Sequence, residues 1–198
     1  MIAREGMAPL VVAVIAGVGV LHYIGVMESL PFWLLAVLMV VLFRDPERDI
    51  PSQPLAVVSP ADGKVVAVEN THDPYLLRQA TRVIIQMTAY GVYTTRSPIE
   101  GKVLEPQNIP DGDHMPHGVW LQSDEGDDVV VVMTRGPLRN EPRCNIRFGD
   151  RIGQGKRCGY IHLGGRVEVY LPENARLTIK EGDTVQGGAD IIAKLVRV

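Results

Sequence analysis

The segment AVVSPADGKVVAVE, residues 56–69, decides the fold of the larger part of this chain. Its two runs of branched aliphatic residues flank an Asp-Gly pair, a pattern typical of short β-strands joined by a tight turn. Similar runs follow along the chain, among them RVIIQMTAYGVYTT (82–95), DVVVVMT (128–134) and GRVEVYL (165–171). The sequence therefore predicts a mostly β domain, in which only residues 75–80 (YLLRQA) fit a helix.

Two internal similarities predict duplicated hairpin units. SPADGKV (59–65) matches SPIEGKV (97–103), and GDRIGQG (149–155) matches GDTVQGG (182–188). The Gly-Asp pattern is similar to that of biotinyl and lipoyl carrier units, so we expect a flattened barrel or sandwich with barrel-hairpin repeats of that kind. Lys64 and Lys102 follow glycines at such turns but lack the Met-Lys or Asp-Lys context of a modified lysine, which argues against a carrier function.

Length and composition exclude several classes of protein. With 198 residues and 21.7 kDa, the chain can form one compact domain of ordinary size plus an appendage. Its net charge of -3 argues against binding to nucleic acid, which needs a basic surface. Two cysteines, Cys144 and Cys158, make neither a disulfide framework nor a four-ligand zinc site.

The N-terminal region is apolar enough to enter a membrane. Residues 8–27 contain no charged side chain, and this length matches a helix that crosses the hydrocarbon core. A second apolar run covers residues 30–43 and is short for a full span. Pro31 suits the first turn of a helix, which favours a helical hairpin with its turn at Glu28 and Ser29. The sequence leaves open whether one helix or two cross the membrane.

Arginines flank the apolar region on its outer sides only, with Arg4 before it and Arg44 and Arg48 after it. The positive-inside tendency then places both ends in the cytoplasm, with the anchor in the inner or cell membrane. A cleaved signal peptide is disfavoured because the first run exceeds a typical apolar signal core. The expected domains are a membrane anchor (1–43), a Pro-rich linker (44–54) and a β domain (55–198).

Several short motifs follow one another along the whole chain. They are IAREG (2–6), FRDPER (43–48), SPADGKV (59–65), RSPIEGKV (96–103), GYI (159–161) and GGRVEVYLP (164–172). In this order they resemble the short prokaryotic type of phosphatidylserine decarboxylase. Members of this family are proenzymes that cut themselves at a Gly-Ser bond and convert the serine into a pyruvoyl group. The resemblance implies that this carbonyl forms a Schiff base with the substrate amine and accepts the electrons released with carbon dioxide.

The chain departs from the family pattern at the positions that carry this chemistry. Gly164 and Gly165 stand where the family has Gly-Ser, so residue 165 has no hydroxyl to attack the preceding carbonyl. Tyr93 stands at the position of a histidine base, and only Asp62 is retained from the family's catalytic set. The sequence therefore predicts that no pyruvoyl cofactor forms and that the chain is a membrane-anchored pseudoenzyme of phospholipid metabolism. The alternative is an active decarboxylase that converts phosphatidylserine to phosphatidylethanolamine and carbon dioxide by a non-standard route.

Binding partners follow from the same interpretation. A membrane phospholipid is the expected ligand, with Arg96 and Arg166 as candidates for contact with its headgroup. A protein partner in lipid synthesis and a homodimer are further expectations. No metal is expected, although His114 and His117 in the DHMPHG loop could hold a divalent ion in a different lyase or hydrolase.

Overall fold

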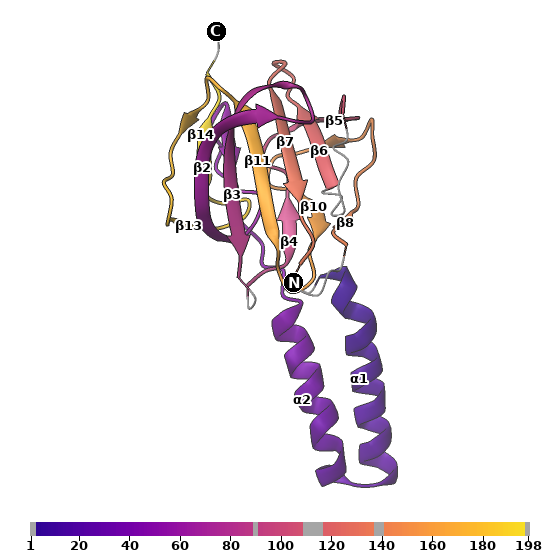
Figure 1. The fold of residues 1–198 in the computed structure, drawn as a ribbon. Coiled ribbons are helices and arrows are strands. Elements are labelled where there is room, and N and C mark those ends of the chain that lie inside the picture. The colour runs from indigo at the N-terminus through magenta and orange to yellow at the C-terminus, as the bar shows by residue number, and fades with distance from the viewer. Residues whose placement is uncertain (1–2, 89–90, 109–116, 137–140, 197–198) are drawn as a thin grey trace. The chain divides into compact units, whose positions relative to one another are not determined.

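The computed structural model describes residues 3–88, 91–108, 117–136 and 141–196. The chain divides into two compact units, Met1–Glu47 and Arg48–Val198. The first unit is a pair of helices and the second is built from β-strands (Figure 1). The prediction of a mostly β chain preceded by a helical hairpin is confirmed.

The hairpin consists of α1 (Arg4–Tyr23) and α2 (Val26–Leu42). Its turn lies at residues 24 and 25, where the N–H groups of Ile24 and Gly25 both donate to the carbonyl of Val20 at 2.9 and 3.1 Å. The prediction of a turn at Glu28 and Ser29 is wrong, because both residues belong to the first turns of α2. The Ser29 hydroxyl donates to the Val26 carbonyl at 2.7 Å, so this polar group is satisfied within the helix.

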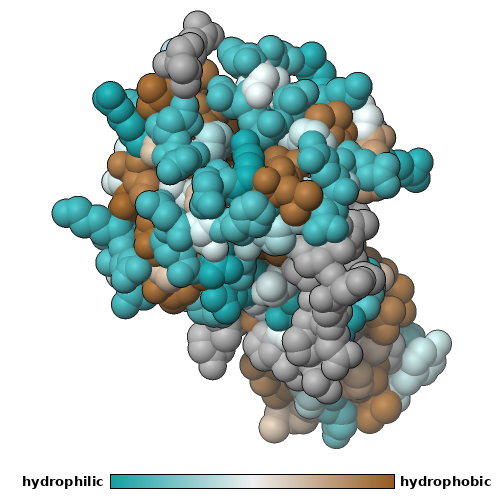
Figure 2. Space-filling view, turned by 45° about the horizontal axis from the view of Figure 1, so that its top comes forward, coloured by the Kyte–Doolittle hydropathy of each residue, from teal (hydrophilic) through white to brown (hydrophobic). Residues whose placement is uncertain are grey.

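The helices carry most of the exposed large apolar side chains of the described chain. The visible face of the β unit, by contrast, is mostly hydrophilic (Figure 2). Between the helices, Gly17 lets Phe32 and Trp33 approach, since a Cβ at this glycine would lie 3.3 Å from Phe32 and 3.5 Å from Trp33. Among the described residues, one helix is long and apolar enough to cross a membrane (6–23), and α2 is shorter.

The described part of the β unit contains antiparallel strands in three sheets. The strands are β1 (Ala56–Val58), β2 (Gly63–Asp73), β3 (Arg78–Met87), β4 (Thr94–Arg96), β5 (Gly101–Leu104), β6 (His117–Gln122), β7 (Asp128–Met133), β8 (Arg143–Cys144), β9 (Arg151–Ile152), β10 (Arg157–Tyr160), β11 (Arg166–Pro172), β12 (Arg176–Leu177), β13 (Thr184–Val185) and β14 (Ile191–Lys194). The largest sheet has the order β13-β2-β3-β11-β7-β6-β5-β9, and the smaller ones are β1-β14-β12 and β4-β10-β8. The strand β11 therefore lies near the middle of the eight-stranded sheet (Figure 1).

The larger hydrophobic core lies on one face of this sheet, and a smaller apolar cluster that includes Tyr75, Val130 and Tyr170 lies on the other. In β11, Val167, Val169 and Leu171 alternate along the strand and are fully buried. Their partners in β3 and β7 include Ile85 and Val131, which are buried to the same extent. This alternation is the period-2 pattern that the sequence shows at residues 165–171, so the apolar set of each strand reaches the same side.

The segment predicted as a helix at residues 75–80 is a turn followed by a strand. The fully buried Asp73 accepts the N–H groups of Tyr75 and Leu76 with Oδ1, at 2.9 and 3.4 Å. This Asx-type turn ends β2, and β3 begins at Arg78. A helix does not continue here, because Leu77 has a left-handed φ of 52° and the residues from Arg78 onward pair with β2.

The repeated motifs have matching local structures. The Ser59 hydroxyl donates to the carbonyl of Ala61 at 2.8 Å, and the Ser97 hydroxyl donates to that of Ile99 at 2.7 Å. The glycines that follow begin β2 and β5, and each packs directly against a backbone carbonyl of the adjacent strand. In the second pair, the N–H groups of residues 147 and 180 each donate at 2.8 Å to an aspartate three residues later. The strands β9 and β13 then close the two edges of the sheet against β5 and β2.

Candidate functional site

Three segments meet where the resemblance places the catalytic positions. The start of β2 pairs with the end of β3 through Gly63 and Met87. On the other side of β3, the N–H of Met87 donates to the carbonyl of Gly165 at 2.9 Å. Asp62, which precedes Gly63, and Gly165 therefore lie at the same end of the sheet, on strands about 10 Å apart. The fold brings together two positions that are 103 residues apart in the sequence.

The loop before β11 is tightly turned. Leu163 and Gly164 both have a positive φ, 57° and 74°, and the Gly164 N–H donates to the Ile161 carbonyl at 3.2 Å. A left-handed backbone is uncommon for a leucine and marks a conformation imposed by its surroundings. The carbonyl of Gly165 is held from β3 by the side-chain amide of Gln86 at 3.1 Å, in addition to Met87.

The space around Gly165 suits a residue without a side chain. A Cβ at this position would lie 2.8 Å from Cγ2 of Ile161 and 3.0 Å from the carbonyl oxygen of Thr134. Ile161 is fully buried, so its methyl group cannot move into solvent. A larger residue at position 165 therefore requires a small shift of the loop.

Tyr93 lies beside the same loop. Its carbonyl accepts the N–H of Ile161 at 2.9 Å, and its side chain is buried. The Tyr93 ring meets the Tyr160 ring edge-on at 6.0 Å, and Tyr160 meets His162 at 5.0 Å. An imidazole is therefore present close to the loop, although it comes from residue 162 and not from residue 93.

Both oxygens of the Asp62 carboxylate have donors. The N–H of Gly187 donates to Oδ1 at 2.7 Å, and the guanidinium of Arg48 donates to Oδ2 at 2.5 Å. A second nitrogen of Arg48 donates to the side-chain oxygen of Gln186 at 2.8 Å. Sequence reasoning assigned Arg48 to membrane topology and missed this contact, because its partners lie 14 and 138 residues away.

A hydroxyl that contacts β11 comes from Thr134, the residue that follows β7. The Thr134 side chain donates to the carbonyl of Arg166 at 2.8 Å, one residue beyond Gly165. The sequence did not identify this hydroxyl, because Thr134 is remote from Gly165 along the chain. The residues at this position do not fit a self-derived pyruvoyl group. Gly165 has no hydroxyl, and the Thr134 hydroxyl donates its hydrogen bond to the carbonyl of Arg166 and not to that of Gly164.

The two arginines expected to meet a headgroup also contact the protein. A guanidinium nitrogen of Arg96 donates to the Gly155 carbonyl at 3.1 Å, and Arg166 lies 3.3 Å from Glu168. Tyr170 donates to the other oxygen of Glu168 at 3.1 Å. Burial raises the pKa of Tyr170 above its usual range, so its hydroxyl stays protonated at neutral pH.

Two of the predicted candidates fall at the edge of what the structure describes. His114 lies outside the described residues, and His117 begins β6 with no description of its side chain. Among the described residues, no group of three or more histidines, cysteines or carboxylates is placed to hold a metal ion.

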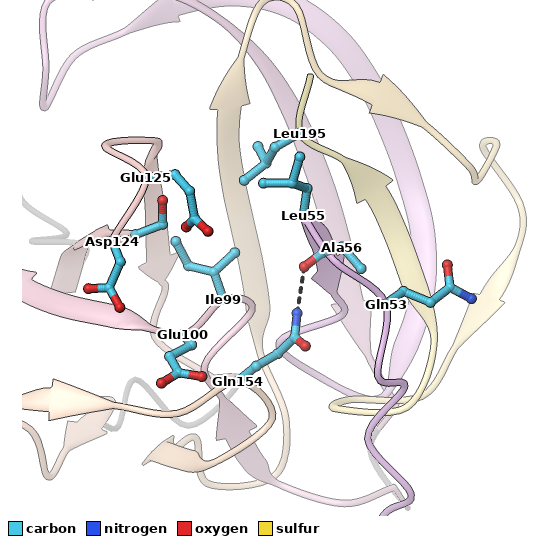
Figure 3. Close-up of a pocket in the computed structure, with 10 residues that line it drawn as sticks. Gln53, Leu55, Ala56, Ile99, Glu100, Asp124, Glu125, Gln154 and Leu195 are labelled. Carbon is cyan, nitrogen blue, oxygen red and sulfur yellow. Dashed lines mark hydrogen bonds between the residues drawn. The ribbon is translucent and has the colours of Figure 1, made fainter. Parts of the chain in front are cut away.

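A pocket of about 280 Å³ lies elsewhere on the β unit. Figure 3 shows acidic side chains on one of its sides and aliphatic ones on another. Gln154 crosses its base and donates to the Ala56 carbonyl at 2.5 Å. The lining residues are Gln53, Leu55, Ala56, Ile99, Glu100, Ser123, Asp124, Glu125, Gln154 and Leu195. None of the positions that the resemblance assigns to catalysis lines this pocket.

Comparison with known proteins decides the family. Residues 35–193 match the family model described as phosphatidylserine decarboxylase. The chain belongs to the phosphatidylserine decarboxylase family. It is 36% identical to the phosphatidylserine decarboxylase proenzyme of Burkholderia vietnamiensis (strain G4 / LMG 22486), over 98% of this chain and 96% of that protein. It is 33% identical to the proenzyme of the same name from Nitrosomonas eutropha (strain DSM 101675 / C91 / Nm57), over 98% and 94%.

These relatives contradict the prediction of a pseudoenzyme. Proteins that are similar to this chain along 98% of its length bear the name of a decarboxylase proenzyme. The sequence interpretation gave the departures at positions 93 and 165 more weight than the agreement along the rest of the chain. The findings support the alternative that was set beside it, an active decarboxylase.

Proposed function

We propose that this protein decarboxylates phosphatidylserine to phosphatidylethanolamine and carbon dioxide in phospholipid metabolism. The observation that supports this function is the full-length similarity to phosphatidylserine decarboxylase proenzymes. The apolar helix at residues 6–23 is consistent with a membrane lipid as substrate. We further propose that the first 43 residues anchor the protein in the inner or cell membrane, with the β domain in the cytoplasm.

The proposed site comprises Asp62, Tyr93, Gly164 and Gly165, with Arg96 and Arg166 as candidates for headgroup contact. The convergence of the β2 start, the β3 end and the loop before β11 supports this choice. Gly164–Gly165 is proposed as the counterpart of the family's processing dipeptide. Because Gly165 has no hydroxyl, the proposed route does not draw its reactive carbonyl from the side chain of residue 165.

Two finer proposals concern architecture. The matching turns at residues 147–150 and 180–183 support the resemblance to biotinyl and lipoyl units. A homodimer and a protein partner in lipid synthesis are proposals without a specific contact in the described chain.

A turnover assay tests the proposed function. The full chain is purified in detergent, reconstituted into vesicles that contain phosphatidylserine labelled in the serine carboxyl group, and followed by release of labelled carbon dioxide. We expect release together with an equal amount of phosphatidylethanolamine. Treatment with cyanoborohydride and an amine, followed by intact mass, detects a reactive carbonyl wherever it is held. A folded protein that releases no label above protein-free vesicles would contradict the proposal.

A substitution at residue 165 tests the proposed processing position. Gly165→Ser supplies a hydroxyl next to the Gly164 carbonyl, and we expect two fragments in a denaturing mass spectrum, the second beginning at residue 165 and reacting with hydroxylamine. Gly165→Ala adds the same Cβ, which crowds Ile161 equally, and we expect the mass pattern of the unmodified chain. If both variants give the same pattern, the processing position lies elsewhere.

A further inference from the structure

The carboxylate of Asp62 is fixed from two directions. Gly187 and Arg48 donate to different oxygens, at 2.7 and 2.5 Å, so neither oxygen can turn without losing a partner. The Arg48 and Asp62 side chains are only 15% and 20% exposed. At this exposure a charge-assisted hydrogen bond is stronger than one at an open surface.

We call these two hydrogen bonds, from Gly187 and from Arg48, the Asp62 clamp. The backbone at Gly187 has little room to move relative to Asp62. A Cβ at Gly187 would lie 3.0 to 3.2 Å from three backbone atoms of Ala61, the residue before Asp62. The adjacent Gly188 N–H donates to the carbonyl of Ser59 at 2.7 Å. The turn at residues 186–190 is thereby pressed against the turn that carries Asp62.

The Arg48 side comes from a different part of the chain. Arg48 is the first residue of the β unit and follows the helical hairpin by six residues. Its guanidinium spans Asp62 and Gln186, so one side chain ties the post-helix segment to both turns. Nearby, Ile50 packs against Gly155, where it occupies the space of a side chain at that glycine. The segment is therefore attached to the β unit through side chains and not only through its covalent connection.

We infer that Arg48 is a positioning residue for the site, acting through the carboxylate of Asp62. This inference rests on the proposed function, since Asp62 is a site residue only if the chain is a decarboxylase. A planar guanidinium offers two parallel donors, and here one orients Asp62 while the other fixes the direction of the fork on Gln186. The segment that leaves the helices thus supplies a group on which the geometry of the site depends.

A double-mutant cycle tests this inference in the full chain. The variants are Arg48→Gln, Asp62→Asn and their combination, with Arg48→Lys as the conservative variant and Arg176→Gln, at an exposed arginine of β12, as the matched control. We expect Arg48→Gln to lower kcat about tenfold with KM within about twofold, because misplacing a group that acts in the reaction affects the transition state more than binding. Arg48→Lys should recover part of kcat, since it keeps the charge without the fork.

The cycle discriminates a positioning role from a general structural one. If Arg48 acts through Asp62, Arg48→Gln causes no further loss of kcat in the Asp62→Asn background. Equal losses of kcat in both backgrounds, or no loss in either, would overturn the inference. Arg176→Gln should leave both constants unchanged.

A readout that needs no turnover separates this inference from the proposed function. Hydrogen exchange of the Gly187 amide reports on its bond to Asp62, and we expect exchange to be several-fold faster in Arg48→Gln and unchanged in Arg176→Gln. If neither the unmodified chain nor any variant releases carbon dioxide, the proposed function is wrong. Faster Gly187 exchange in Arg48→Gln would then still support the hydrogen bonds that hold Asp62. Unchanged exchange in Arg48→Gln would refute the clamp whatever the activity.

Discussion

Replacing Gly63 with alanine will lower the free energy of unfolding by about 3 kcal/mol, the upper end of the usual cost of overpacking. A Cβ at this position would overlap the backbone carbonyl of Gln86 in β3. The strand β3 cannot retreat, because its other edge pairs with β11 over seven residues, from Gln86–Arg166 to Ala80–Pro172. Gly101 packs in the same way on Gln122, so Gly101→Ala should have a similar effect. Urea unfolding of the full chain in detergent, followed by tryptophan fluorescence, measures both.

Gly153→Ala is the control for this prediction. A Cβ at Gly153 would meet only Cγ of Lys156 at 3.4 Å, the middle of a flexible and exposed side chain. We expect its free energy of unfolding to stay within about 0.5 kcal/mol of the unmodified chain. If Gly63→Ala were as mild as Gly153→Ala, the close approach of β2 to β3 would be wrong.

Asp73→Ala will also destabilise the protein, by about 3 kcal/mol, the cost typical of breaking a buried charged network. The Asp73 carboxylate is fully buried, accepts two backbone N–H groups and lies 3.6 Å from Nε of Arg78. Its removal leaves these donors without an acceptor beneath the turn that joins β2 to β3. The same urea unfolding experiment measures the change, and Asp73→Asn should retain part of the stability because its carbonyl oxygen can still accept from the backbone.

Asp124→Ala provides the contrast for an ion pair in solvent. Asp124 pairs with Arg151, but both side chains are about 60% exposed, at 63% and 59%. Exposed pairs contribute little, so we expect a loss of about 0.5 kcal/mol or less. Equal losses for Asp73→Ala and Asp124→Ala would show that burial does not determine the effect of these carboxylates.

Local patterns in the sequence predicted much of the fold. The runs of branched aliphatic residues, including residues 165–171, predicted short strands, and Arg166–Pro172 form β11. The paired motifs at residues 59 and 97 predicted related hairpin units. Both serines make the same hydrogen bond, but β1 and β2 lie in different sheets, as do β4 and β5, so neither motif joins a hairpin. The strand and turn predictions succeeded because side-chain alternation and turn chemistry operate over a few residues.

Two predictions about local structure were wrong. Residues 75–80 have the composition of a short helix, yet Leu77 has a left-handed φ and the residues from Arg78 onward pair with β2 as β3. The hairpin turn was expected at Glu28 and Ser29, but it lies at Ile24 and Gly25, where α1 ends and Ser29 remains in α2. Composition alone did not reveal either hydrogen-bond arrangement.

The candidate site shows the same division. The resemblance drew attention to Asp62, Tyr93 and Gly165 from motifs that lie far apart in the sequence. Strand pairing places the start of β2 and the loop before β11 on either side of the end of β3. The contacts of Thr134 with Arg166, and of Arg48 with Asp62, carried no signal that identified them in advance.

The sequence by itself determined the membership of this protein in its family, the apolar helical region and the mostly β character of the rest, because these depend on composition, motif order and short-range periodicity. It also determined that residue 165 has no hydroxyl. Only the tertiary structure decided that Arg48 and Gly187 hold the Asp62 carboxylate and that Ile161 and Thr134 surround Gly165. Apart from that of Ile161 with Gly165, these contacts join residues at least 14 and up to 125 positions apart, and only the packing of the strands brings them together.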